Sequence, residues 1–312
     1  MDPFGAVLKD GYIWGRGSVD FMTKQHSDQI DAEFALTEGG SGTLENGCVT
    51  VVQIQTTEKV PRETHLVVRG TSGHGSVPRG DNALIHLSAA VAKVGSWETP
   101  MRLNDTTRTY FEKLAAISPP DKAARYNGLL DPKRAPAIQR YLAVNEPQRY
   151  SMLRTSIVPT ILRAGFRVNV IPSQAEATLD VRALPDEDMD KLYVEMQKVI
   201  GDPAVKIERV PGNERPAGAP SRLDTEMYRA LEQVTKRMYP GATVLPEMST
   251  GATDMAQLRA KGIQCYGIGP ARTEEDATNY GAHSDVERLM ESSLYKFVEF
   301  TWNAVTEVAV GK

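Results

Sequence analysis

The order of strand-like and helix-like segments between residues 59 and 212 is the feature that most constrains the fold. Residues 64–69 alternate apolar and polar side chains, as a half-buried strand does, and residues 82–94 carry apolar side chains at helical spacing. Further strands are predicted at 156–163, 174–183 and 205–210, with a helix at 187–200. This β-α-β-β-α-β order predicts an α+β, ferredoxin-like domain with a four-stranded antiparallel sheet and two helices on one face.

The segments that flank this domain have a different pattern. Residues 1–58 contain short strand-like runs between glycine-rich turns, and the run VTVVQIQ at 49–55 is rich in β-branched residues. Towards the C-terminus, helical spacing of apolar residues returns near 225–238 and 286–310. One α/β domain is therefore expected to be built from both ends of the chain.

The chain has 312 residues, about twice the length of a typical domain, so two domains are expected. We place the first in residues 1–58 and 213–312, and the second, inserted domain in residues 59–212. Residues 98–155 are rich in Pro, Arg and Asp and contain helical pieces. We interpret them as a helical insertion within the second domain, without chemistry of its own.

Composition and charge argue against several classes of partner. A net charge of −4 disfavours a nucleic acid, which would need a basic face. No apolar run approaches the roughly 20 residues of a membrane-spanning helix, so no membrane partner is expected. No signal-peptide pattern is visible, and a cytoplasmic location follows if this N-terminus is genuine. Cys48 and Cys265 lie far apart and form no metal-binding or disulfide pattern.

Seven short motifs follow one another along the chain. They are GRGSVD at 15–20, FALTEGG at 34–40, GHGSVP at 73–78, NVIP at 169–172, DVR at 180–182, GATD at 251–254 and GAHSD at 281–285. In this order they resemble the zinc metallopeptidase and amidohydrolase family that includes aminoacylase, carboxypeptidase S, acetylornithine deacetylase and succinyl-diaminopimelate desuccinylase. The resemblance covers essentially the whole chain. It implies an α/β catalytic domain, here truncated, and an inserted lid or dimerisation domain.

The resemblance implies a zinc site in the first domain. Asp20 would bridge two zinc ions, Glu38 would be a terminal ligand of one ion, and His283 would be a ligand of the other. Carboxylates and a neutral imidazole suit Zn²⁺, and a bridging carboxylate can hold two ions roughly 3.5–4 Å apart. Considered alone, an Asp or Glu beside glycines is usually only a turn residue.

The same resemblance assigns further residues to the substrate. His74 would polarise the scissile carbonyl, and Asn169 and Arg182 would help to grip the substrate, because a guanidinium group matches a carboxylate bidentately. Gly251 and Thr253 belong to a loop whose backbone N–H groups would receive the substrate's carboxylate. The plainer interpretations are a turn histidine, a surface arginine and a helix N-cap.

The chain departs from the family pattern in two places. The family has a His-x-Asp pair upstream of the bridging Asp, which supplies one zinc ligand and the carboxylate that orients it, and this chain has no such pair before Asp20. The family's Glu-Glu pair, which supplies the general base and another ligand, is absent from the 17 residues between Asp20 and Glu38. We therefore expect one zinc ion or none, instead of two, and impaired hydrolysis of N-acyl amino acids or small peptides.

Two other clusters match parts of the missing pattern. The sequence HSD at 26–28 has the His-x-Asp spacing but follows Asp20, and a Glu-Glu pair at 274–275 lies in a polar stretch before His283. Solvent-exposed loops are the simpler interpretation of both clusters.

Three hypotheses for the function remain open at this point. The first is an impaired metal-dependent hydrolase, and the second is a catalytically degenerate, dimeric binding or regulatory remnant. The third is a metal-independent esterase, suggested only by the Ser-x-x-Lys spacing of Ser293 and Lys296. The resemblance implies a homodimer joined through the inserted domain, and a small acyl-amino-acid or peptide substrate.

Overall fold

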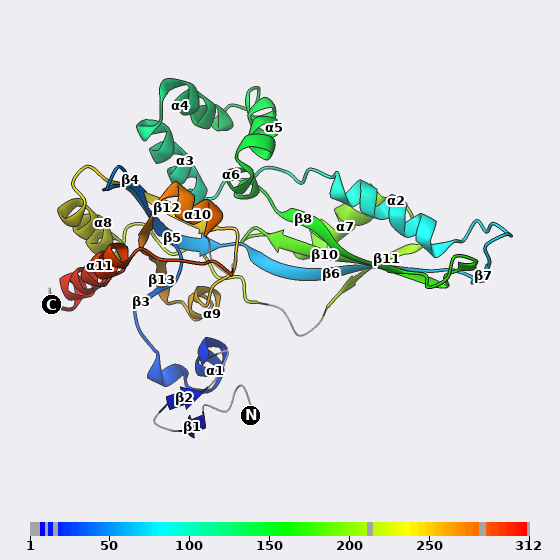
Figure 1. Ribbon diagram of the computed structural model, residues 1–312, viewed down its shortest axis with the longest axis horizontal. Coiled ribbons are helices and arrows are strands. Elements are labelled where there is room, and N and C mark those ends of the chain that lie inside the picture. The colour runs from blue at the N-terminus through cyan, green and yellow to red at the C-terminus, as the bar shows by residue number, and fades with distance from the viewer. Residues whose placement is uncertain (1–6, 10–11, 15–17, 211–214, 281–284, 311–312) are drawn as a thin grey trace. The chain divides into compact units, whose positions relative to one another are not determined.

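The chain folds as two compact units in the computed structural model, which describes residues 7–9, 12–14, 18–210, 215–280 and 285–310 (Figure 1). Unit 1 comprises Met1–Glu58, Leu103–Pro147 and Gly218–Lys312. Unit 2 comprises Lys59–Arg102 and Gln148–Ala217.

Unit 2 has the four-stranded antiparallel sheet that the sequence predicts. Its strand order is β11-β6-β10-β8, formed by Val205–Arg209, Val60–Arg69, Gln174–Ala183 and Ser156–Ala164. From its second residue on, β10 alternates strictly between buried and half-exposed residues, because successive side chains of a strand point to opposite faces. The prediction of a ferredoxin-like strand order is confirmed.

Helices α2 (Ala83–Gly95) and α7 (Met189–Ile200) cover the buried face of this sheet (Figure 1). Their buried apolar residues, at helical spacing, pack on the inward-facing residues of the strands. Asn82 and Asp188 begin the two helices as N-caps, each accepting a hydrogen bond from a backbone N–H of the first turn. A separate two-stranded sheet joins β7 (Gly73–His74) to β9 (Val170–Ile171).

Unit 1 is built on a six-stranded mixed sheet. Five strands follow the order β14-β4-β5-β13-β3, and the sixth, β12, pairs with β5 in parallel. Their bounds are β14 (Ala271–Arg272), β4 (Ser41–Glu45), β5 (Cys48–Glu58), β13 (Gln264–Gly267), β3 (Phe34–Thr37) and β12 (Thr243–Ser249). Helices α8 (Glu226–Met238) and α11 (Glu291–Val310) share a hydrophobic core with β5, in which Ile54 is fully buried. This sheet therefore combines strands from both ends of the chain: β3 and β5 from the N-terminal part, and β12 and β13 from the C-terminal part.

The segment Leu103–Pro147 clusters with unit 1, whereas the sequence interpretation placed residues 98–155 within the inserted domain. Its helices are α3 (Asp105–Ile117), α4 (Pro120–Asn127), η2 (Gly128–Leu130) and α5 (Ala135–Asn145), and α6 (Pro147–Ser151) leads into unit 2. The physical reason is that α3 packs against β12 and is also tied to β5, because the hydroxyl of Thr106 forms a hydrogen bond of 2.9 Å with that of Thr56 in β5.

The remaining elements are short. The N-terminal part contains β1 (Val7–Lys9), β2 (Tyr12–Trp14), α1 (Ser18–Gln25) and η1 (Ser27–Gln29), and the C-terminal part adds α9 (Met255–Arg259) and α10 (Glu274–Asn279). The sequence patterns predicted strands and turns in the first 58 residues, so α1 is a helix that they missed. Within the described residues, every helix is too short or too polar to cross a bilayer.

Two glycines let the chain turn sharply where β3 ends. Gly39 and Gly40 have φ angles of +121° and +60°, a region that favours glycine. A Cβ atom on Gly40 would lie 2.3 Å from the carbonyl oxygen of Gln53 and 2.5 Å from that of Gly267. Both neighbours are backbone atoms in the sheet, so they have little freedom to move aside.

We expect Gly40→Ala to lower the free energy of unfolding by about 3 kcal/mol, because left-handed strain and overpacking add. Gly47→Ala is the matched control, since Gly47 also has a positive φ, of +80°, but its Cβ would meet nothing within 4 Å. Thermal or urea denaturation of both variants measures the difference. Equal losses for the two variants would show that the close approach at Gly40 carries no cost.

Candidate functional site

Glu38 meets the loop of residues 250–254 in unit 1. Glu38 directly follows β3, and its Oε1 atom accepts a hydrogen bond of 3.3 Å from the backbone N–H of Asp254. The hydroxyl of Thr37 donates to the other carboxylate oxygen. A residue that the sequence assigned to metal binding and a loop that it assigned to substrate binding, 216 positions apart, are therefore adjacent in the fold.

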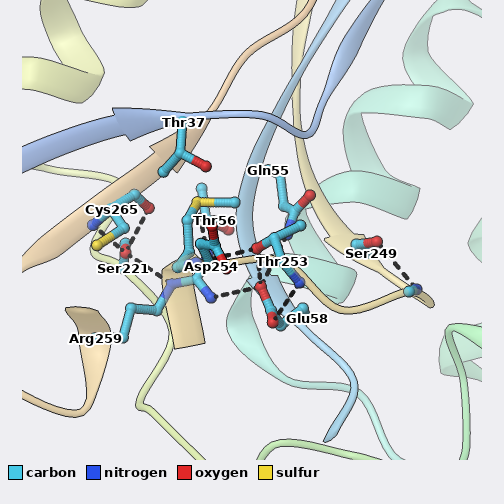
Figure 2. A network of polar contacts seen from close by, with 12 residues as sticks. Thr37, Gln55, Thr56, Glu58, Ser221, Ser249, Thr253, Asp254, Arg259 and Cys265 are labelled. Carbon is cyan, nitrogen blue, oxygen red and sulfur yellow. Dashed lines mark hydrogen bonds and ion pairs between the residues drawn. The ribbon is translucent and has the colours of Figure 1, made fainter. Parts of the chain in front are cut away.

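Three backbone N–H groups of this loop, those of Gly251, Thr253 and Asp254, already have acceptors within the protein. The N–H of Gly251 donates to Ser249 Oγ at 3.1 Å, and that of Thr253 donates to Glu58 Oε1 at 2.9 Å (Figure 2). The N–H of Asp254 is bonded to Glu38. A substrate carboxylate would have to compete with these oxygen atoms for the same donors.

Glu58 and Arg259 form a buried ion pair next to the loop (Figure 2). Their side chains are 4% and 3% exposed, and Arg259 Nη1 donates to Glu58 Oε2 at 3.2 Å. The same carboxylate accepts hydrogen bonds from the hydroxyl of Thr253 and, at 3.2 Å, from Gln55 Nε2. Burial lowers the pKa of Arg259, and the negative charge of Glu58 opposes that shift. No sequence motif pointed to this pair, because its partners are 201 positions apart.

Ser221 and Cys265 surround the other side of the Arg259 guanidinium group (Figure 2). Ser221 Oγ accepts hydrogen bonds from Arg259 Nε at 3.3 Å and from the N–H of Cys265 at 2.9 Å, and it donates to the carbonyl of Cys265 at 2.7 Å. Burial raises the pKa of the Cys265 thiol to about 11. A thiol with this pKa is protonated at neutral pH, so Cys265 is unsuited to nucleophilic attack.

Glu247 is a further carboxyl group that the motifs missed. It lies on β12 opposite Gln55 of β5, so the two side chains share one face of the sheet. Burial raises the pKa of Glu247 to about 7. The available signal in the sequence was a single charged residue inside the apolar run VLPEM at 244–248.

The residues assigned to the substrate in unit 2 lie at two places along its sheet. His74 is in β7, and the N–H of the next residue, Gly75, donates to the carbonyl of Asn169 at 2.8 Å, so His74 and Asn169 are neighbours. Arg182 lies in β10, the strand that follows β9 in the chain. It is eight residues beyond the first residue of β10, which corresponds to roughly 26 Å along the strand. Within unit 2, the structure brings His74 and Asn169 together and leaves Arg182 apart from them.

Arg182 lies in a cluster of charged and polar groups. Its Nε atom donates to Asp180 Oδ1 at 2.8 Å, and its side chain is 33% exposed. Nearby, the fully buried Lys59 donates from Nζ to the hydroxyls of Ser151 and Ser156 at 3.0 and 2.9 Å. Burial lowers the pKa of Lys59 to about 7, and the positive charge of Arg182 acts in the same direction. A lysine with this pKa is only partly charged at neutral pH, which limits its repulsion of Arg182.

The described residues do not make a zinc site on their own. The backbone of Asp20 lies in α1, but its side chain is outside the described part, and His283 falls outside the described residues altogether. Among the residues that are described, no three His, Cys, Asp or Glu side chains are grouped so that they could hold a metal ion. Of the three predicted zinc ligands, Glu38 is the one whose side chain the structure describes. Each of its carboxylate oxygens accepts one hydrogen bond and has a second lone pair that could bind a metal ion.

The two clusters that match parts of the family pattern lie at the starts of two short helices. Residues 26–28 straddle the start of η1, where Asp28 is exposed. Glu274 and Glu275 form the first turn of α10, where negative charge is favourable at a helix N-terminus.

A family comparison identifies the central part of the chain. Residues 58–208 match the peptidase dimerisation domain of the M20 peptidases. This match contains β6, β8, β10, α2 and α7 of unit 2.

Curated relatives align with most of the chain. Probable carboxypeptidase S-like 2 of Dictyostelium discoideum is 28% identical over 301 positions, covering 81% of this chain and 57% of that protein. The human N-fatty-acyl-amino acid synthase/hydrolase PM20D1 is 25% identical over 305 positions, covering 81% of this chain and 60% of that protein. The chain thus spans less than two thirds of the length of these relatives.

The mouse PM20D1 alignment extends over 359 positions and 98% of this chain, which has only 312 residues. The mouse protein therefore contains several dozen residues, within the aligned region, that have no counterpart here.

Solved structures share the fold. A metallo-carboxypeptidase of the M20 family from Sulfolobus solfataricus has a TM-score of 0.62 and 18% identity, covering 92% of this chain and 66% of its own. The dipeptidase Dug1p of Saccharomyces cerevisiae has a TM-score of 0.57 and 15% identity, covering 93% of this chain and 62% of its own. The sequence relatives and the fold agree: residues 58–208 match the dimerisation domain of the M20 peptidases, and most of the chain is similar to proteins of that family, which includes carboxypeptidase S and aminoacylase.

Proposed function

We propose that the chain is a metal-dependent hydrolase of the amidohydrolase and exopeptidase type, acting on N-acyl amino acids or small peptides. The observation that carries this proposal is the contact between Glu38 and the N–H of Asp254. It places a proposed zinc ligand beside the loop that is proposed to bind the substrate's carboxylate. Relatives named for such chemistry support it: besides PM20D1, human aminoacylase-1 is 29% identical over 148 positions, which cover 46% of this chain.

The proposal assigns roles to residues of both units. Asp20, Glu38 and His283 are the proposed ligands of one zinc ion. Arg182 is proposed to bind the substrate's free carboxylate, since a guanidinium group matches a carboxylate bidentately. His74 and its neighbour Asn169, which lie apart from Arg182 within one chain, are proposed to contact the scissile carbonyl in the site of the partner subunit of the homodimer. Gly251 and Thr253 are proposed to support carboxylate binding through their loop.

We expect slow hydrolysis of an N-acyl amino acid that is abolished by a chelator and restored by added zinc, because the family's general base has no counterpart between Asp20 and Glu38. Asp20→Ala and His283→Ala should each lower kcat/KM at least about 100-fold, as loss of a ligand does. Glu274→Ala is the control and should retain wild-type activity. Hydrolysis that survives both chelation and the ligand substitutions would contradict the metal-dependent mechanism.

A catalytically degenerate dimer is the second candidate, and one observation favours it. In the loop at 250–254, the N–H of Asp254 is bonded to Glu38 and that of Thr253 to Glu58, both side chains of the protein itself. In such a remnant the loop would be a structural connection only. The esterase hypothesis gains no geometric support, since Lys296 Nζ pairs with Glu299 at 3.0 Å and Ser293 is 7% exposed.

We propose that the homodimer forms through unit 2, at strand β8 and helix α2. Strand β8 is at the edge of its sheet, and edge strands present unpaired backbone groups to a partner. Apolar side chains on and beside this edge are unusually exposed; they include Val158, Ile161, Leu162, Phe166 and, on α2, Ile85.

We expect Leu162→Glu to convert a dimer into a monomer, because it places a charge on the apolar edge, where Leu162 is 63% exposed. Leu294→Glu, at an exposed apolar position of α11 in unit 1, is the matched control and should remain dimeric. Light scattering at micromolar concentration distinguishes the two states. A wild-type monomer, or a Leu162→Glu variant that stays dimeric, would rule out this interface.

A further inference from the structure

The guanidinium group of Arg259 touches three separate parts of unit 1. Nη1 donates to Glu58 at 3.2 Å, Nε donates to Ser221 Oγ at 3.3 Å, and Nη2 lies 3.3 Å from the sulfur atom of Met255 (Figure 2). The fixed fork of a guanidinium group holds such partners in a defined geometry, which an ammonium group does not.

Two of these partners lie where the chain passes between the units. Glu58 is the last residue of the first segment of unit 1, and unit 2 begins at Lys59. Unit 1 resumes at Gly218, three residues before Ser221. The N–H of Ser221 donates to the carbonyl of Thr56 at 2.8 Å, so the outgoing and returning segments are hydrogen-bonded to each other.

The returning segment also packs directly on Arg259. A Cβ atom on Gly218 would lie 2.5 Å from the Cβ atom of Arg259, so only glycine allows this approach. Glu58, in turn, holds the loop through both the N–H and the hydroxyl of Thr253. One buried ion pair therefore joins the loop to both chain segments.

We propose that Glu58 and Arg259 are positioning residues that hold the loop of residues 250–254 in a fixed place relative to two of the four points where the chain passes between the units, namely those at Glu58 and Gly218. The proposal deepens the proposed function and rests on it for the role of the loop in substrate binding. Neither residue needs to touch the substrate, since the pair acts through Thr253 and the adjacent N–H of Asp254.

Amide hydrogen–deuterium exchange of the loop tests the proposal without a substrate. In Arg259→Met, the amides of Thr253 and Asp254 should exchange about tenfold faster, the equivalent of one lost hydrogen bond. Arg259→Lys, which keeps the charge, should recover part of the protection. Arg237→Met removes an exposed arginine that pairs with Glu307, and it should leave the loop unchanged.

A double variant separates positioning from simple stability. Arg259→Met alone leaves Glu58 buried without its cation and can unfold the chain, whereas Glu58→Leu with Arg259→Met removes both charges. We expect the double variant to regain a melting temperature near that of the wild type, to keep fast exchange at Thr253 and Asp254, and to raise KM for an N-acyl amino acid more than it lowers kcat. Slow exchange of these amides in the double variant would overturn the proposal. A wild-type protein without hydrolytic activity would refute the proposed function instead, and the exchange result would still decide the positioning role.

Discussion

The carboxylate of Glu58 is buried together with its cation Arg259, and the arrangement of the site depends on that pair. Isolating one of the two charges by removing the other costs about 3–5 kcal/mol, a large part of the stability of an ordinary domain. The carboxylate is satisfied only if Thr253, Gln55 and Arg259 are all in place. The pair therefore fixes the loop that reaches Glu38, and the position of Glu38 follows from the loop and from the glycine turn after β3.

Unit 2 could be predicted from the sequence because its elements are regular and local. Residues 174–183 were predicted as a strand and form β10 with the same bounds, since alternation over ten residues has one structural solution. The helix predicted at 187–200 is observed as Met189–Ile200, which begins at an Asp cap and ends at Gly201 with a φ of +62°. The family resemblance rested on short motifs, and the comparisons confirm it.

The parts that escaped prediction depend on contacts between distant residues. Strand β12 contains Pro246, which argues against a central strand. Among the described residues β12 pairs with β5 alone, so it is an edge strand, where a proline is tolerated. The helices of residues 103–147 pack on unit 1 through side chains such as Thr106, which no local pattern reveals. The Glu58–Arg259 pair is of the same kind, because neither residue lies in a recognisable motif.

The proposed zinc site rests on the resemblance to zinc peptidases and on the observed position of Glu38. Glu38 is held by Thr37 and by the loop, and this fixes one proposed zinc ligand before any ion is bound. Zinc content per chain, measured by elemental analysis of the purified protein and of Glu38→Ala, is the most direct test of the proposed zinc site. We expect one zinc ion per chain in the wild type and none in Glu38→Ala. Two ions per wild-type chain, or the same zinc content in both proteins, would contradict it.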